Sequence, residues 1–153
     1  KKILEDNFGL SMKEYRRMLY LSLIKEKVSQ QIDNEAIRIS ETVQAGVKAG
    51  KTLKAIADEL GDKVLYEETG GLVDKMNVDG GRAGIAMELA AGQTSDRVMS
   101  SSGDGYYFVT LVNKTESSVN YTSIKVPFSE FNKRVKQVRE SSGVKEFIKL
   151  SEE

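Results

Sequence analysis

Two adjacent tyrosines, Tyr106 and Tyr107, follow a turn rich in serine and glycine over residues 100–105 and open a run of strand-forming residues. A phenol can donate or accept a hydrogen bond, and serine hydroxyls can orient a carbonyl group of a bound peptide. The pattern is compatible with two structures, a core strand entered from a hairpin turn or the rim of a peptide-binding site. In the first structure, strand alternation places one tyrosine in the core and the other at the surface.

The 153 residues include no His and no Cys. This composition excludes zinc sites built on these ligands, thiol nucleophiles, His-based catalytic triads and haem ligation by His or Cys. Acid–base chemistry near neutral pH would require a carboxylate, a lysine or a tyrosine with a shifted pKa. The glycine-rich stretch 68–84 fits neither an EF-hand, nor a dinucleotide-binding loop, nor a P-loop, so we expect a plain surface loop, with no metal and no cofactor.

The charges balance, with 23 basic and 23 acidic residues and no basic block, which argues against binding to nucleic acid. No run of about 18 apolar residues is present, so no membrane-spanning segment is predicted. The length suits one domain, with or without a helical appendage. Because the sequence begins with Lys1 rather than Met, we expect any signal peptide or membrane anchor to lie outside this segment.

The clearest predicted helix covers residues 10–32. Ser11 and Glu14 have the spacing of a capping box at its start. Apolar residues recur at positions 15, 18, 19, 23, 24 and 28, and we expect this stripe to pack against a protein core, with a client-binding surface as the alternative. Asp33 or Asn34 can cap a second helix over 35–49, and a third over 53–60 ends at Gly61 as a left-handed cap.

The second half of the chain predicts a small antiparallel sheet between helices. Strands are expected at 63–68, 106–112 and 119–126, with the last two forming a hairpin. Short helices are expected at 86–92, closed by Gly92, and at 129–141, with Phe131, Val135 and Val138 facing inward. Residues 144–150 fit either a helix or a strand. The fold class is therefore α+β, with helices packed on a small antiparallel sheet.

Several blocks of the sequence, taken in order, resemble the SurA/PrsA-type chaperones and their parvulin-type peptidyl-prolyl isomerase domain. Residues 9–32 resemble the last long helix of the chaperone region, and residues 36–61 resemble the first parvulin helices. The C-terminal parvulin block is matched by Ala86, Leu89, Gly92, Ser95, Asp96, Val98, Gly105, Tyr106 and Leu111. The resemblance implies a chaperone-type helical region at 1–33, a degenerate parvulin-like domain at 34–128 and a C-terminal helical extension at 129–153.

The resemblance also implies a proline-binding groove whose usual residues are replaced. Tyr107 stands where the family has a His on the groove floor, and is the candidate catalytic residue. The remaining candidate substrate-binding positions are Val78 and Arg82 in place of groove apolar residues, Met87 in place of a core aromatic, Ser101 among the hydroxyls before the glycine, and Ser123 where a strand His would stand. Isomerisation needs no nucleophile, only a groove that binds the twisted amide best, so the missing His leaves activity open.

The family's first strand has no room before the second helix of this chain. We expect residues 119–126 to fill the vacant place in the sheet by pairing with 106–112 in the same chain. A dimer formed by strand or helix swapping is the alternative.

Three functions follow from the resemblance. The first is an extracytoplasmic foldase that isomerises prolyl bonds, with unfolded or exported polypeptides as partners. The second is a non-catalytic holdase that binds such chains on a degenerate parvulin scaffold. The third is an assembly module with one dedicated partner. The resemblance places the protein in the bacterial periplasm or at the cell surface, with membrane contact only through an anchor outside this segment.

Overall fold

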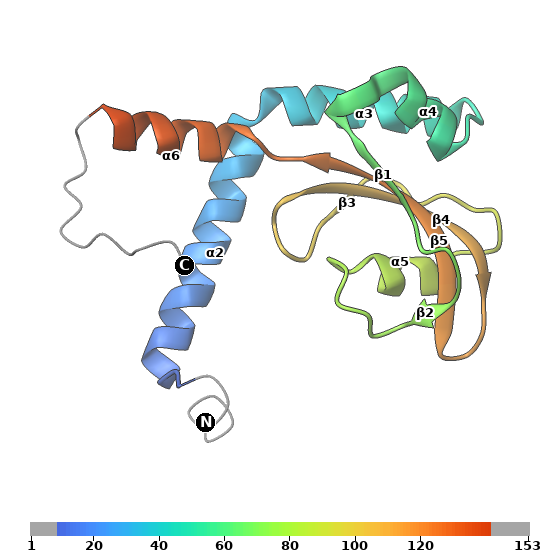
Figure 1. The fold of residues 1–153 in the computed structure, drawn as a ribbon, viewed down its shortest axis with the longest axis horizontal. Coiled ribbons are helices and arrows are strands. Elements are labelled where there is room, and N and C mark those ends of the chain that lie inside the picture. The colour runs from blue at the N-terminus through green and yellow to red at the C-terminus, as the bar shows by residue number, and fades with distance from the viewer. Residues whose placement is uncertain (1–8, 142–153) are drawn as a thin grey trace.

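The computed structural model describes residues 9–141, which form an α+β fold as predicted. This part of the chain contains five α-helices, a short 3-10 turn at Gly61–Lys63 and one antiparallel sheet of five strands. Helices α3 and α4 lie over one face of the sheet, α5 lies on the other face, and α2 and α6 project to one side (Figure 1). Residues 142–153, including the element predicted at 144–150, lie outside the described residues.

Helix α2 spans Met12–Ile32 and starts with the predicted capping box. The Ser11 hydroxyl accepts from the Glu14 backbone N–H at 3.3 Å, and the Ser11 N–H donates to the Glu14 carboxylate at 2.8 Å. The predicted packing of its apolar stripe is wrong for most of the helix. Six large apolar side chains between positions 18 and 24 are 41% to 64% exposed, because the helix extends beyond the body of the molecule (Figure 1).

Asp33 connects three elements through one buried carboxylate. Its Oδ1 accepts from the Ala36 N–H at 3.0 Å and caps α3, Asn34–Lys48, which confirms the predicted cap. Its Oδ2 accepts from the backbone N–H groups of Ser129 at 2.6 Å and Glu130 at 3.0 Å, where α6 begins. Helix α6 spans Glu130–Glu140. The angle between α2, α3 and α6 is therefore held at a single side chain.

The sheet is built on a long hairpin of β4, Gly105–Lys114, and β5, Ser118–Pro127. The two strands pair antiparallel within one chain, as predicted, with Phe108 opposite Ile124. Strand β1, Leu65–Glu68, and the short β2, Val73–Asp74, both pair with β5, whereas β3, Val98–Met99, pairs with β4. The order β1-β5-β4-β3 places β5 inside the sheet.

The sheet has a core on each face. Alternate residues of the hairpin pack with α3 and with α4, Leu53–Leu60, in a first cluster that includes Tyr106 and Phe108. The residues between them, including Tyr107 and Val109, pack with α5, Arg82–Glu88, in a second cluster. Tyr106 is 9% exposed and Tyr107 is 4% exposed, so the predicted surface tyrosine is wrong. The two side chains do alternate across the sheet, but helices cover both faces.

Element boundaries differ from the predictions around residues 68–92. The predicted loop at 68–84 contains β2 and the first turn of α5, which begins at Arg82 and ends at Glu88 instead of covering 86–92. Gly92 lies in a turn, where its N–H donates to the Leu111 carbonyl at 2.8 Å. Gly61 follows α4 with a positive φ of 60°, but its ψ of −133° is not left-handed helical. These differences are local and leave the fold class unchanged.

Candidate functional site

Two cationic side chains, Arg82 and Lys125, lie close to the ring of Tyr107 on β4. The Arg82 guanidinium carbon lies 5.0 Å from the ring centroid, and the Lys125 Nζ lies 5.8 Å from it. Lys125 is the residue directly opposite Tyr107 in the β4–β5 register. Both distances are within the range of cation–π attraction, which is stronger where the groups are removed from water. The position expected on the groove floor is therefore enclosed.

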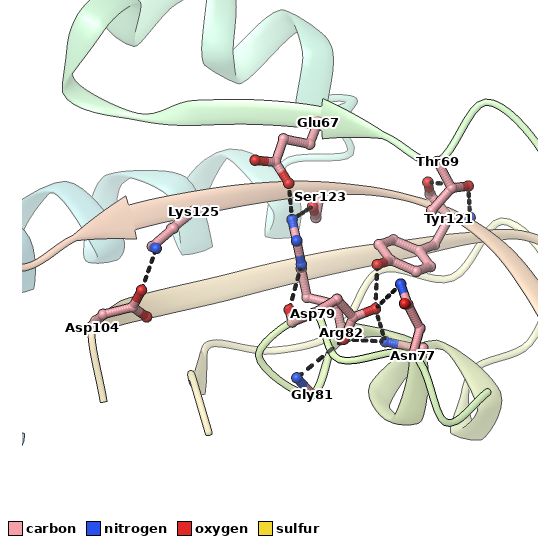
Figure 2. A network of polar contacts seen from close by, with 11 residues as sticks. Glu67, Thr69, Asn77, Asp79, Gly81, Arg82, Asp104, Tyr121, Ser123 and Lys125 are labelled. Atoms are coloured by element: carbon pink, nitrogen blue, oxygen red, sulfur yellow. Dashed lines mark hydrogen bonds and ion pairs between the residues drawn. The ribbon is translucent and has the colours of Figure 1, made fainter. Parts of the chain in front are cut away.

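Arg82, at the first position of α5, ties the helix to two strands. Its Nη1 forms an ion pair with Glu67 on β1 and donates to the Ser123 hydroxyl on β5 at 3.2 Å (Figure 2). Its Nε donates to the Asp79 carbonyl at 2.8 Å. Burial alone would lower the pKa of Arg82, but the hydrogen bond with Glu67 and the electrostatic attraction of Glu67, Tyr121 and Tyr107 together outweigh burial and raise the pKa. This guanidinium is a permanent cation that positions the 79–82 segment.

The Asp79 carboxylate accepts hydrogen bonds from backbone N–H groups at the start of α5 and from the hydroxyl of Tyr121. The Tyr121 hydroxyl donates to Asp79 Oδ2 at 2.5 Å, and the N–H groups of Gly81 and Ala83 donate to the same carboxylate, each at 3.1 Å (Figure 2). Burial first, and then the neighbouring Asp79, raise the pKa of Tyr121 well above its usual range. Tyr121 therefore stays a neutral donor at physiological pH.

Asp104 and Lys125 form a second ion pair near Tyr107 (Figure 2). The Ser102 hydroxyl donates to Asp104 Oδ1 at 2.8 Å, and the hydroxyls of Ser100 and Ser102 are 2.6 Å apart. Burial alone would raise the pKa of Asp104, but hydrogen bonds from Lys125, Ser100 and Ser102 outweigh it and lower the pKa to about 2. The shifts at Asp104, Tyr121 and Arg82 all move away from neutrality, so these groups are suited to holding structure and not to proton transfer.

No protein-family model, curated protein or solved structure matches this chain. Evidence about function therefore comes from the geometry of its surfaces and polar groups.

The structure brings together three of the six predicted site residues. Arg82, Tyr107 and Ser123 lie in one network beneath α5. Ser101 lies next to this network, and its backbone N–H donates to the carbonyl of Gly80 at 3.0 Å. The predicted residues therefore meet in a buried cluster that one hydrogen bond and one cation–π contact join.

The other two predicted residues lie elsewhere. The Val78 side chain is 99% exposed, and Met87 packs at the edge of the second core cluster. A shallow pocket of about 220 Å³ lies beside Arg82, and its lining includes Glu67, Asp79 and Tyr121 but not Tyr107. The predicted residues thus do not line one shared groove for a proline ring.

Sequence reasoning missed Glu67, Asp79 and Tyr121. Asp79 lies two residues before Gly81, the N-cap of α5, so the usual capping position does not indicate it even with the correct helix boundary. Glu67 and Tyr121 also carry no local signal, because their partners lie 15 and 42 residues away along the chain.

A second candidate surface is apolar and lies on α2 and α6. The exposed apolar residues of α2 are Met18, Leu19, Tyr20, Leu21, Leu23 and Ile24. They surround the helix and do not follow one stripe. A groove of about 310 Å³ lies where α2 meets α6, lined by Val28, Ile32, Phe131, Arg134, Val135, Val138 and Arg139. We call this the α2–α6 groove. Within residues 9–141, no helix combines the length and hydropathy that crossing a bilayer requires.

Charge is distributed unevenly between this helix pair and the rest of the chain. Helices α2 and α6 carry nine basic and four acidic residues, a net charge of +5. Residues 33–129, which lie between them, carry ten basic and fourteen acidic residues, a net charge of −4. The zero net charge of the whole chain therefore conceals a positive apolar surface beside an acidic body.

Proposed function

We propose that this protein is a chaperone that binds unfolded polypeptides on a parvulin-like scaffold without catalysing prolyl isomerisation. The observation that carries the proposal is the exposed apolar stretch at 18–24 of α2. A helix that is apolar on all sides is normally buried, because each exposed side chain leaves apolar surface in water. A flexible client chain can wrap such a helix, whereas a flat rigid partner would cover only one side of it.

The chemistry of the client follows from the charges around the stretch. Lys13, Arg16 and Arg17 precede it, and Lys25 and Lys27 follow it. Basic side chains at both ends favour apolar segments flanked by Asp or Glu, through attraction that is screened by salt. We therefore expect binding to weaken as ionic strength rises, but to persist through the apolar contacts.

The parvulin-like part of the proposal rests on the sequence resemblance and is supported by the sheet. Strand β5 lies between β1 and β4, in an interior place that suits a strand replacing the family's first strand. The location outside the cytoplasm rests on the resemblance alone. The enclosed position of Tyr107, between Arg82 and Lys125, favours the non-catalytic alternative over the isomerase, because a groove floor must contact the substrate.

Suppression of client aggregation tests the proposal. The variant Leu21→Asp should lose most of the suppression, because it places a charge in the centre of the apolar stretch. Leu72→Asp is a matched control, since Leu72 and Leu21 are both 54% exposed but Leu72 lies in the loop before β2. Equal suppression by both variants and the unaltered protein would refute the proposed role of α2.

A further inference from the structure

The α2–α6 groove is an apolar surface with a fixed shape and no covering element among residues 9–141. Helix α6 has no buried residue, and Val135 and Val138 remain exposed although they share the face that lines the groove. The Asp33 carboxylate holds the start of α6 at the end of α2, so the two helices that form the groove cannot rotate freely about their junction. Exposed apolar grooves of this kind commonly mark a site of interaction.

We propose that residues 144–150 of the same chain occupy the α2–α6 groove as an intramolecular cover. This segment contains four large apolar residues, Val144, Phe147, Ile148 and Leu150, within seven positions. It starts three residues after Ser141, the residue that caps the end of α6, and Gly143 between them permits a reversal of the chain.

The dimensions agree with this assignment. Eleven residues make α6 about 16 Å long. A segment of seven residues covers about 10 Å as a helix or about 23 Å as an extended chain. After a reversal at Gly143, either form would be long enough to reach the residues of α6 that line the groove.

The acidic residues that favour this assignment follow the apolar segment, because residues 144–150 themselves carry two lysines and one glutamate. Arg134 and Arg139 lie at the groove, and the chain after the apolar segment carries Glu152 and Glu153. Residues 142–153 have three acidic and two basic side chains, opposite in sign to the helix pair at +5. Exposed ion pairs of this kind add little affinity, so the four apolar side chains carry most of the binding and the carboxylates orient the segment.

The tether favours this occupant over a second copy of the protein. A segment joined to its groove by a short linker has an effective concentration in the millimolar range, far above that of separate chains. The consequence for function rests on the proposed polypeptide binding. The cover leaves 18–24 of α2 accessible but makes clients compete for the groove, so its removal should increase the length of client chain that is protected.

A spin label tests the cover directly, without any client. The chain has no Cys, so Lys149→Cys provides a single attachment site that leaves the four apolar residues intact. In the full chain, the oxidised label should broaden the methyl signals of Val28, Ile32, Val135 and Val138, and reduction of the label should restore them. The same label at Val112→Cys, an exposed position near the end of β4, should leave these signals unchanged.

Two variants and one mixing experiment make the result decisive. With the label at position 149, Phe147→Asp should abolish the broadening, whereas Phe147→Leu should retain it. Groove methyl signals unaffected by that label in the otherwise unaltered chain would overturn the proposal. The mixing experiment combines spin-labelled chains at natural isotope abundance with isotope-enriched chains that carry no spin label. Broadening in this mixture would also overturn the proposal, because a second copy of the protein would then be the occupant. If the unaltered protein bound no client chain but the spin label still broadened the groove signals, the proposed function would be refuted and the proposed cover would stand.

Discussion

Asp33 and Ser129 are joined by a hydrogen bond of 2.6 Å, from the Ser129 backbone N–H to the Asp33 carboxylate, across 96 positions of sequence. The same carboxylate, 1% exposed, caps α3 at Ala36 and receives the N–H of Glu130 at the start of α6. The Asp33 side chain therefore holds together the point at which α2 ends and α6 begins, the two helices that line the apolar groove. A defect there should alter stability and the geometry of the proposed binding surface together.

Asp33→Ala should lower the free energy of unfolding by about 2–3 kcal/mol, because three backbone donors at two helix starts lose a charged acceptor. Urea denaturation measures the change. Ser11→Ala is the control, since it removes a cap at the exposed free end of α2 and should cost at most about 1 kcal/mol. Equal losses in the two variants would show that Asp33 has no role beyond ordinary capping.

Gly80→Ala should destabilise the protein more than Gly70→Ala does. Both glycines have positive φ, +75° and +67°, so alanine introduces backbone strain of about 1 kcal/mol or more at each. Only at Gly80 would the new Cβ lie 3.0 Å from the Tyr107 ring and 3.2 Å from the Ser100 hydroxyl, whereas no atom lies within 4 Å at Gly70. Thermal unfolding of both variants measures the difference, and similar melting temperatures would contradict the close packing over Tyr107.

Stability should fall in acid partly through Asp104. Its pKa is lowered to about 2 in the folded protein from an ordinary value of 3.8, so its ion pair with Lys125 stabilises the fold above about pH 4. That contribution is lost as pH falls from about 4 towards 2, when the carboxylate takes up a proton. The effect is small because Asp104 is partly exposed.

Asp104→Asn should therefore flatten the dependence of unfolding free energy on pH between about 4 and 2. Asp62→Asn, which makes the same change of charge in the 3-10 turn after α4, should retain the dependence. An unchanged slope in Asp104→Asn would contradict the assigned pKa and the importance of the ion pair.

The protein should not accelerate the isomerisation of a proline-containing peptide above its uncatalysed rate, which corresponds to tens to hundreds of seconds. The reason is that Tyr107 is buried beneath α5 between two cations. A protease-coupled or NMR exchange assay measures the rate. Acceleration that disappears in Tyr107→Ala, with the fold intact by circular dichroism, would establish the isomerase and refute the non-catalytic proposal.

The sequence by itself determined the features that depend on neighbouring residues. The capping box of Ser11 and Glu14, the cap at Asp33, the helices over 34–60 and the β4–β5 hairpin all follow from short-range hydrogen bonds and apolar periodicity, and the α+β class follows from their order. Three positions of the predicted site, Arg82, Tyr107 and Ser123, lie in one cluster, and their role in binding a peptide stays a prediction.

Only the tertiary structure decided which of these surfaces are open. Periodicity shows that Tyr106 and Tyr107 face opposite ways, but not that α3 and α4 cover one face while α5 covers the other. The apolar spacing of α2 is the same whether the helix packs in a core or projects from it. Burial depends on contacts between residues far apart in the chain, as between Glu67 and Arg82 or Asp79 and Tyr121, and local spacing does not encode those contacts.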